Sequence, residues 1–200
     1  MQELTSLTAA PRAAGTKGHA RRLRASGMLP GVMYGKNAEP TAVAVNPKET
    51  AAVLSTEYGF NKVFNLDVDG ASTLVMVKDY QFDPIRRELT HLDFYAVDPE
   101  QFVTLRVPVS TTGASVGVKA GGRLQIVSRD VKLTCRVKDI PSTVPHDVTA
   151  VHVGESVYVD EMVAPEGCEF VFKNRYPVIR VARKRGAKVR GGDEAAAVAE

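Results

Sequence analysis

Short runs of β-branched residues, separated by Gly, Pro, Asp and Asn, recur along most of this chain and restrict the folds that it can adopt. Such runs are typical of short strands and leave little room for long helices. The second half predicts strands at residues 103–109, 124–127, 131–137, 148–151, 156–159, 169–172 and 178–181. An all-β fold, arranged as a sandwich or a barrel, is therefore expected there.

The first half combines strand patterns with two short helices. Residues 17–26 lie between Thr16, a favoured N-cap residue, and Gly27, which is typical of the position after a helix. A second helix is expected at residues 48–56, because Pro47 favours the first helical position. The expected strands cover residues 4–8, 41–45, 63–68, 73–80 and 88–95, with Asp69-Gly70 as a hairpin turn and one further strand opened by Pro30. This half is expected to form a compact, mostly antiparallel sheet.

The length of 200 residues allows one large domain or two small ones. We predict a boundary near Asp98-Pro99, with domains at residues 1–96 and 97–183. Residues 184–200, basic and then rich in Ala and Glu, form a tail that is expected to be disordered.

The composition indicates a cytoplasmic protein without membrane association. An apolar fraction of 44% and a charged fraction of 24% are ordinary for a globular protein. The start of the chain lacks the pattern of a signal peptide, and no stretch is long and apolar enough for a membrane span. Cys135 and Cys168 have no metal-ligand spacing and fit a reducing cytosol, although a disulfide between them stays open.

A basic block lies near the start of the chain. Six basic residues and no acid lie between Arg12 and Lys36, whereas the net charge of the whole chain is only +3. Such a concentration indicates a polyanion-binding surface, for which RNA or DNA is the commonest partner. Lys17, Arg21 and Arg24 lie on one stripe of the predicted helix. The alternative is a solvated helix face, which most charged stripes are.

Polar residues also alternate along two predicted strands. Asp79 and Gln81 share one face of the first strand, and His91 and Asp93 share one face of the second. If the strands are neighbours, these groups converge. They could then form a general base with its orienting carboxylate, a site that contacts RNA base edges, or a structural polar network, which the residues alone favour.

The segment Gly113-Ala114-Ser115-Val116-Gly117 matches the G-x-S-x-G pattern of hydrolases, and Asp139 and His146 follow in the hydrolase order. That motif requires a helix after the serine, and residues 118–122 predict a poor helix. We therefore expect no catalytic residue here, and interpret the segment as a glycine-rich turn or a protein-contact loop.

Several motifs, in order, resemble the bacterial ribosomal protein L25 family in its long two-domain form, also called the general stress protein CTC family. The first group comprises Arg12, Gly15, Lys17-Gly18, Arg21-Arg22-Leu23-Arg24, Gly27, Pro30 and Tyr34-Gly35. The later motifs are Lys78-Asp79-Tyr80-Gln81, Pro84, His91-Leu92-Asp93-Phe94, residues 113–122 and Asp139-Ile140-Pro141. The resemblance covers about residues 3–182.

The resemblance implies a six-stranded, barrel-like, RNA-binding N-terminal domain and an all-β C-terminal domain. It implies a non-enzymatic, structural role in the large ribosomal subunit, with binding to the loop E region of 5S rRNA in the central protuberance. Neighbouring large-subunit components are further expected partners, and no cofactor, metal or small-molecule substrate is expected. The alternative is a stress-related accessory protein that binds tRNA or another structured RNA.

The RNA-binding residues that the resemblance implies are Arg12, Lys17, Arg21, Arg22, Arg24, Tyr34, Gln81, His91 and Asp93. The cations would attract phosphates, and Gln81, His91 and Asp93 would add discrimination between bases. Tyr34 could instead pack on a strand face. Ala20 departs from the pattern, because short members of the family can carry a hydroxyl residue there.

Overall fold

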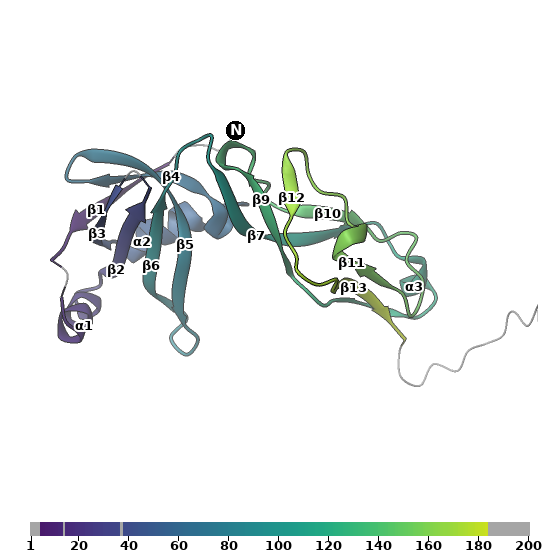
Figure 1. The fold of residues 1–200 in the computed structure, drawn as a ribbon. Helices are drawn as coiled ribbons and strands as arrows, with labels where there is room; N and C mark the ends of the chain where they lie inside the picture. Colours follow the sequence, from purple (N-terminus) through teal and green to yellow (C-terminus); the bar gives the residue numbers. More distant parts are fainter. Residues whose placement is uncertain (1–4, 14, 37, 184–200) are drawn as a thin grey trace, which may run out of the picture. The chain divides into compact units, whose positions relative to one another are not determined.

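The computed structural model describes residues 5–13, 15–36 and 38–183 (Figure 1). It is mainly β, as predicted, with a closed six-stranded barrel, a four-stranded sheet, a three-stranded sheet and a few short helices. The described chain forms two compact units. The first holds residues up to 109 together with 130–144 and 163–173, and the second holds 110–129, 145–162 and 174–183. The predicted tail, residues 184–200, lies outside the described residues.

The barrel contains the first six strands, which are β1 (Ser6–Pro11), β2 (Leu29–Gly35), β3 (Ala38–Val45), β4 (Val63–Val68), β5 (Ala71–Asp83) and β6 (Glu88–Ala96). Their order around the barrel is β1-β3-β2-β6-β5-β4, and parallel pairing of β1 with β4 closes it. β2 and β6 also pair in parallel, while the other neighbours are antiparallel. The mostly antiparallel arrangement predicted for this half is therefore confirmed.

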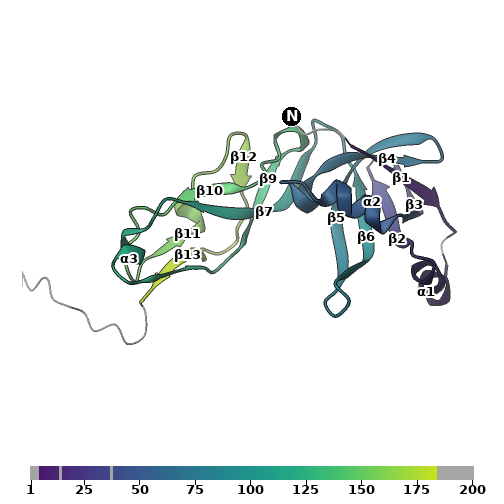
Figure 2. The same ribbon diagram turned by 180° about the vertical axis from the view of Figure 1, so that it is seen from behind.

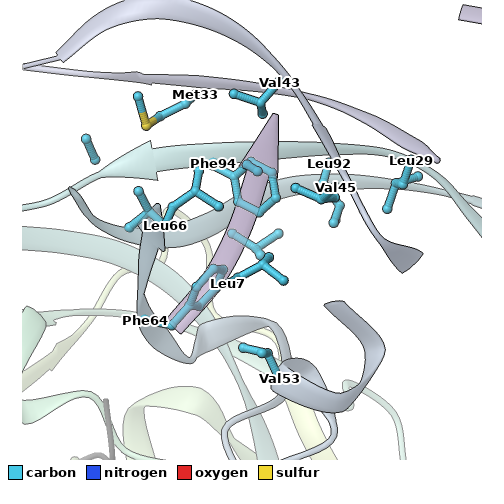
Figure 3. Close-up of a cluster of buried hydrophobic side chains, with 14 residues drawn as sticks. Leu7, Leu29, Met33, Val43, Val45, Val53, Phe64, Leu66, Leu92 and Phe94 are labelled. Atoms are coloured by element: carbon cyan, nitrogen blue, oxygen red, sulfur yellow. The ribbon is translucent and has the colours of Figure 1, made fainter. Parts of the chain in front are cut away.

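Apolar side chains from alternate strand positions fill the barrel (Figure 3). On β6, Leu92 and Phe94 are fully buried, whereas the intervening His91 and Asp93 are only half-buried and lie on the outer face. Phe94 packs edge-to-face against Phe64, with 6.1 Å between the ring centroids. The strand alternation that builds the core therefore also presents polar residues on the outside.

Two helices and a short 3-10 turn (η1, Gly59–Asn61) connect the barrel strands. α2 (Pro47–Leu54) begins with Pro47, as predicted, and the side-chain oxygen of Asn46 accepts a hydrogen bond from the Lys48 backbone N–H at 3.0 Å. Val53 of α2 is buried in the same cluster as the strand residues (Figure 3). α2 is thus anchored by its apolar side, as its short length requires.

α1 (Lys17–Ala25) ends as the sequence predicts. Gly27 has a positive φ of 79°, and its N–H donates to the Arg24 carbonyl at 3.0 Å. The Met28 N–H donates to the Leu23 carbonyl at 3.1 Å, which completes a Schellman motif. Thr16 occupies the N-cap position but makes no side-chain capping bond. No residue of α1 is buried, so the helix lies on the surface.

The later strands form two sheets. They are β7 (Phe102–Thr112), β8 (Arg123–Ile126), β9 (Asp130–Arg136), β10 (Val144–Asp147), β11 (Ser156–Tyr158), β12 (Cys168–Phe170) and β13 (Pro177–Ala182). One sheet has the order β10-β7-β9-β12, and the other has the order β11-β13-β8. The short helices of this part are α3 (Val116–Lys119), η2 (Val137–Asp139) and η3 (Val159–Glu161). No helix in the described ranges is long and apolar enough to cross a bilayer.

The strand predicted at residues 148–151 is wrong. The strand in this region is β10, and the chain turns directly after Asp147, whose side-chain oxygen accepts a hydrogen bond from the Thr149 N–H at 2.9 Å. Such a local side-chain bond competes with strand pairing. Val148 and Val151 are buried, so their apolar character serves packing rather than a strand.

Candidate nucleic-acid interface

α1 presents four exposed cations, Lys17, Arg21, Arg22 and Arg24. Among the ion pairs of the described residues, none involves these four side chains. Arg22 and Arg24 lie in the last turn, where the helix dipole stabilises positive charge and offsets part of their mutual repulsion. Arg22 lies about 100° around the axis from Arg21, away from the stripe of the other three. The helix is therefore a positive ridge whose charges are available to a ligand.

Arg24 connects this ridge to the strands that carry the other predicted residues. Its Nε donates to the Thr90 carbonyl at 3.1 Å, next to His91 on β6. The Thr90 hydroxyl in turn donates to the Gln81 carbonyl on β5 at 3.1 Å. Two sets of residues some sixty positions apart in the sequence are thereby joined in one surface.

The outer face of β2, β6 and β5 carries the polar groups. Gln81 lies opposite His91, and Asp79 lies opposite Asp93 in the antiparallel pairing of β5 with β6. Tyr34 lies opposite Tyr95 in the parallel pairing of β2 with β6. Directly opposed residues share one face of a sheet, so these groups converge on the outside of the barrel.

His91 and Asp93 lie in direct contact, with 2.8 Å between His91 Nδ1 and Asp93 Oδ1. With Nδ1 against the carboxylate, Nε2 is the ring nitrogen left for a ligand. Asp93 has further acceptor capacity, which suits the amino group of a base. The pair can therefore orient groups for hydrogen bonding, and among the described residues no nucleophile is paired with it.

Tyr34 stands beside this pair as a hydroxyl donor. Burial, followed by the negative charges of Asp93 and Asp79, raises the pKa of Tyr34 above its ordinary value, so the hydroxyl stays protonated. Its ring packs edge-to-face against Tyr95, with 5.7 Å between the centroids. Tyr34 thus packs on the strand face and also keeps a polar tip, so both roles considered from the sequence are compatible.

Asp79 is an acidic residue of this face that the implied set of RNA-binding residues omits. It lies opposite Asp93 in the strand register, so two acidic residues are neighbours on this face. Phosphates are repelled there, and base amino groups are the better match. The sequence already placed Asp79 on the same strand face as Gln81. Only the register of β5 against β6 shows that Asp79 is also a neighbour of Asp93.

Arg12 differs from the cations of α1 because its guanidinium is tied to the barrel. Nε donates to the Val43 carbonyl at 3.1 Å, and Nη2 donates to the Gly31 carbonyl at 3.3 Å. The side chain is half-buried and joins the segment after β1 to strands β2 and β3. Arg12 therefore stabilises the barrel by linking β2 to β3, and only the guanidinium N–H groups not used in these two bonds are left for RNA.

The hydrolase-like motif has a structural explanation. Ser115 is only 1% exposed; its Oγ donates to the Val151 carbonyl at 2.6 Å and accepts from the Gly117 N–H at 3.0 Å. It is the N-cap of α3, so a four-residue helix forms where the sequence predicted a poor one. At Gly117, a Cβ would lie 2.8 Å from the His152 carbonyl carbon, which explains the second glycine.

An exposed basic ridge joined to an outward polar patch on a closed barrel is the arrangement expected of a nucleic-acid-binding β-barrel protein. Two family models match the chain: the Ribosomal L25p family over residues 7–94, and the C-terminal domain of ribosomal protein TL5 over residues 102–185. The segment between the two matches contains the predicted boundary at Asp98-Pro99.

Curated relatives agree with these matches. The large ribosomal subunit protein bL25 of Anaeromyxobacter sp. (strain K) is 42% identical over 176 residues, which cover 88% of this chain and 73% of the relative. The bL25 proteins of Syntrophotalea carbinolica and Azorhizobium caulinodans are 38% and 33% identical, over 88% and 98% of this chain and 86% and 96% of their own lengths. The chain therefore belongs to the ribosomal L25p family.

Proposed function

We propose that this chain is a non-enzymatic, structural component of the large ribosomal subunit, and that its barrel binds the loop E region of 5S rRNA. It would act in the cytoplasm, in the central protuberance, beside neighbouring large-subunit components. Family membership supports the ribosomal role. The observation that carries the RNA site is the Arg24–Thr90 hydrogen bond, which joins the basic ridge of α1 to the polar outer face of β5 and β6.

The basic ridge would position the RNA. Lys17, Arg21 and Arg24 are exposed on one stripe, without carboxylate partners among the described ion pairs. Double-stranded RNA presents a wide, shallow minor groove that a short surface helix can approach. Contacts of this kind attract phosphates and fix orientation, and they carry no sequence information.

The polar outer face would discriminate between RNAs. Gln81 offers both a donor and an acceptor, His91 offers its second ring nitrogen, and Asp93 accepts only. The opposed pairing of Gln81 with His91 holds these groups side by side. Base edges in a non-canonical duplex such as loop E present donors and acceptors that this combination can match.

Binding of the full-length protein to 5S rRNA, with and without loop E, tests the proposal. We expect tight binding to the intact RNA and a large loss without loop E. Equal affinity for both RNAs, or a preference for tRNA, would instead support the accessory RNA-binding protein and contradict the loop E assignment.

A second comparison tests the discriminating residues. Gln81→Ala should weaken binding to intact 5S rRNA far more than binding to the RNA without loop E, because a base contact is lost. Gln125→Ala, at an exposed position of β8, is the matched control and should change neither affinity. An equal loss for both RNAs in Gln81→Ala would argue against a base-contacting role.

A further inference from the structure

A groove of about 990 Å³ opens on the barrel between α1, α2 and the turn of the β5–β6 hairpin. Its apolar lining includes Leu54, Phe82 and Leu89. Its cationic lining consists of Arg21 and Arg24 from α1 and Arg86 and Arg87 from the hairpin turn. Figure 2 shows this hairpin extending past α2 on the face seen from behind.

One side of the groove is formed by the part of the β5–β6 hairpin that extends beyond the residues paired with β4. β5 has 13 residues and β6 has nine, whereas β4, the other neighbour of β5, has only six. Phe82 pairs with Leu89 in the part of the hairpin beyond the β4 register. Phe82 is consequently 50% exposed, with a large apolar surface available.

The hairpin turn is held in a fixed shape. The Asp83 side chain accepts hydrogen bonds from the backbone N–H groups of Ile85 at 2.9 Å and Arg86 at 3.2 Å. The Arg87 N–H donates to the Asp83 carbonyl at 2.8 Å, and Arg87 has a positive φ of 56°. The backbone bonds from Arg86 and Ile85 lower the pKa of Asp83, which stays ionised. Its carboxylate is thus used by the turn's own backbone, while Ile85 is 91% exposed at the tip.

The charge along the groove is strongly positive. Four arginines line it against two acids, Asp83 and Glu88. None of the four arginines takes part in a carboxylate ion pair within the described part of the chain. Arg21 and Arg24 belong to the basic ridge as well, so one positive surface continues from α1 to the hairpin turn.

We propose that the RNA footprint extends across this groove, with phosphates on Arg86 and Arg87 and an unstacked base on the open face of Phe82. This inference rests on the proposed function. The guanidinium fork matches phosphate geometry, and an exposed aromatic ring beside it is a common stacking platform for an unpaired base. Because Arg21 and Arg24 of α1 line the same groove, the positive surface extends beyond the groove along α1. A long polyanion such as RNA can cover all of this surface, whereas a short acidic protein segment would fill the groove alone.

The salt dependence of 5S rRNA binding tests the phosphate contacts. The double variant Arg86→Gln/Arg87→Gln should bind roughly tenfold more weakly, and the slope of log K against log salt should fall by about one to two. Arg123→Gln/Arg129→Gln, which removes two exposed arginines outside the barrel, is the matched control and should bind as the wild type does. An unchanged slope in the hairpin variant, with tight wild-type binding, would overturn this inference and leave the proposed function intact. Failure of the wild type to bind 5S rRNA would overturn the proposed function itself.

A tethered probe tests the position of the turn. An iron chelate attached to Ile85→Cys should cleave 5S rRNA at nucleotides bordering loop E. Wild-type protein treated with the same reagent is the control, because Cys135 and Cys168 are buried. Absence of cleavage, with RNA binding retained, would contradict the placement of RNA at the turn.

Substitution of the aromatic ring tests the stacked base. Phe82→Ala should weaken 5S rRNA binding roughly tenfold, and Phe82→Tyr should keep most of it. Equal RNA affinity in Phe82→Ala and the wild type would remove the stacked base from the inference.

Discussion

The barrel and the region from Glu100 onward differ in the ion pairing of their cations. In the later region, Arg175 pairs with Asp160 and Glu161, and Lys138 pairs with Glu100. The arginines of α1 and of the β5–β6 turn have no such partner among the described ion pairs. Arg123 and Arg129 of the later region are exposed and also lack such a partner, so an unpaired cation alone does not distinguish the two regions. The difference teaches that unpaired cations gathered on one surface, beside outward polar groups, distinguish the proposed RNA-binding surface.

Polar side chains of the two regions also differ in whether they are open to a ligand. Ser115 is buried, and both of its hydrogen-bonding functions are used inside the protein, by the Val151 carbonyl and the Gly117 N–H. His91 and Asp93 contact each other but stay half-buried on an outer strand face. A polar residue that is both satisfied and enclosed serves the fold, whereas one that keeps an open face can serve a ligand.

The largest expected effect comes from breaking the barrel core. Phe94→Ala should lower the free energy of unfolding by about 3–5 kcal/mol, because a fully buried ring that packs on Phe64 is removed. Chemical denaturation measures the loss, and 5S rRNA binding should decline with it.

The control for that variant is Ile179→Ala, which removes a fully buried side chain from β13. It should destabilise its own unit and leave 5S rRNA affinity unchanged under conditions where the protein stays folded. An equal loss of RNA binding would show that the RNA surface depends on both units alike.

The two buried cysteines, which lie opposite each other on β9 and β12, predict a pH effect on stability. Burial raises the pKa of Cys135 to about 12 and also raises that of Cys168. Between pH 9 and 12 the Cys135 thiol ionises in the unfolded chain but stays protonated in the folded protein, because its folded-state pKa is raised from 9.0 to about 12. The stability present below pH 9 is therefore lost progressively as the pH rises toward 12. The free energy of unfolding should therefore decline over that range.

Cys135→Ala should flatten this decline, while an Asp79→Asn variant in the barrel should keep it. Thiol labelling at pH 8 offers an independent readout, since both cysteines should react only after unfolding. Rapid labelling of the native protein would contradict the burial of the pair.

Ser115→Ala should have an intermediate effect on stability. Loss of the N-cap and of the bond to the Val151 carbonyl should cost about 1–2 kcal/mol, measured by denaturation. RNA affinity should not change, because the serine belongs to the enclosed class of polar groups. A gain or loss of hydrolytic activity with this variant is not expected, and finding one would revive the hydrolase interpretation.

Arg175→Gln should have the smallest effect. The side chain is exposed, and its carboxylate pairs and its stacking 4.0 Å above the Tyr158 ring are weakened by solvent. We expect a slight shift in the unfolding midpoint and no change in 5S rRNA affinity. A clear loss of RNA binding would show that paired cations also contact the RNA.

Local sequence patterns predicted most of the elements. The ends of α1, the proline start of α2 and the Asp69-Gly70 hairpin follow from short-range rules, and the structure contains them. Short-range patterns failed where buried valines imitated a strand at residues 148–151, and where Ser115 capped a helix that its sequence disfavours.

The residue patterns alone indicated two separate groups, and only the family resemblance put them into one expected RNA-binding set; the contacts that join the groups could not be predicted. The convergence of Gln81 with His91 depends on register, and the pairing of β5 with β6 shifts register twice, between Val77 and Asp79 and between Gln81 and Phe82. The arginines of the hairpin turn escaped prediction, because their place in the groove depends on how far the β5–β6 hairpin extends beyond β4. These quantities are set by strand pairing, which the local sequence does not encode.

The salt dependence of 5S rRNA binding tests the central claim most directly. The account predicts that Arg21→Gln/Arg24→Gln lowers the slope of log K against log salt by about one to two, because two unpaired cations of α1 are lost. Arg175→Gln should keep the wild-type slope. The same slope for all three proteins, with 5S rRNA bound by each, would contradict the claim that the unpaired cations of the barrel hold the RNA.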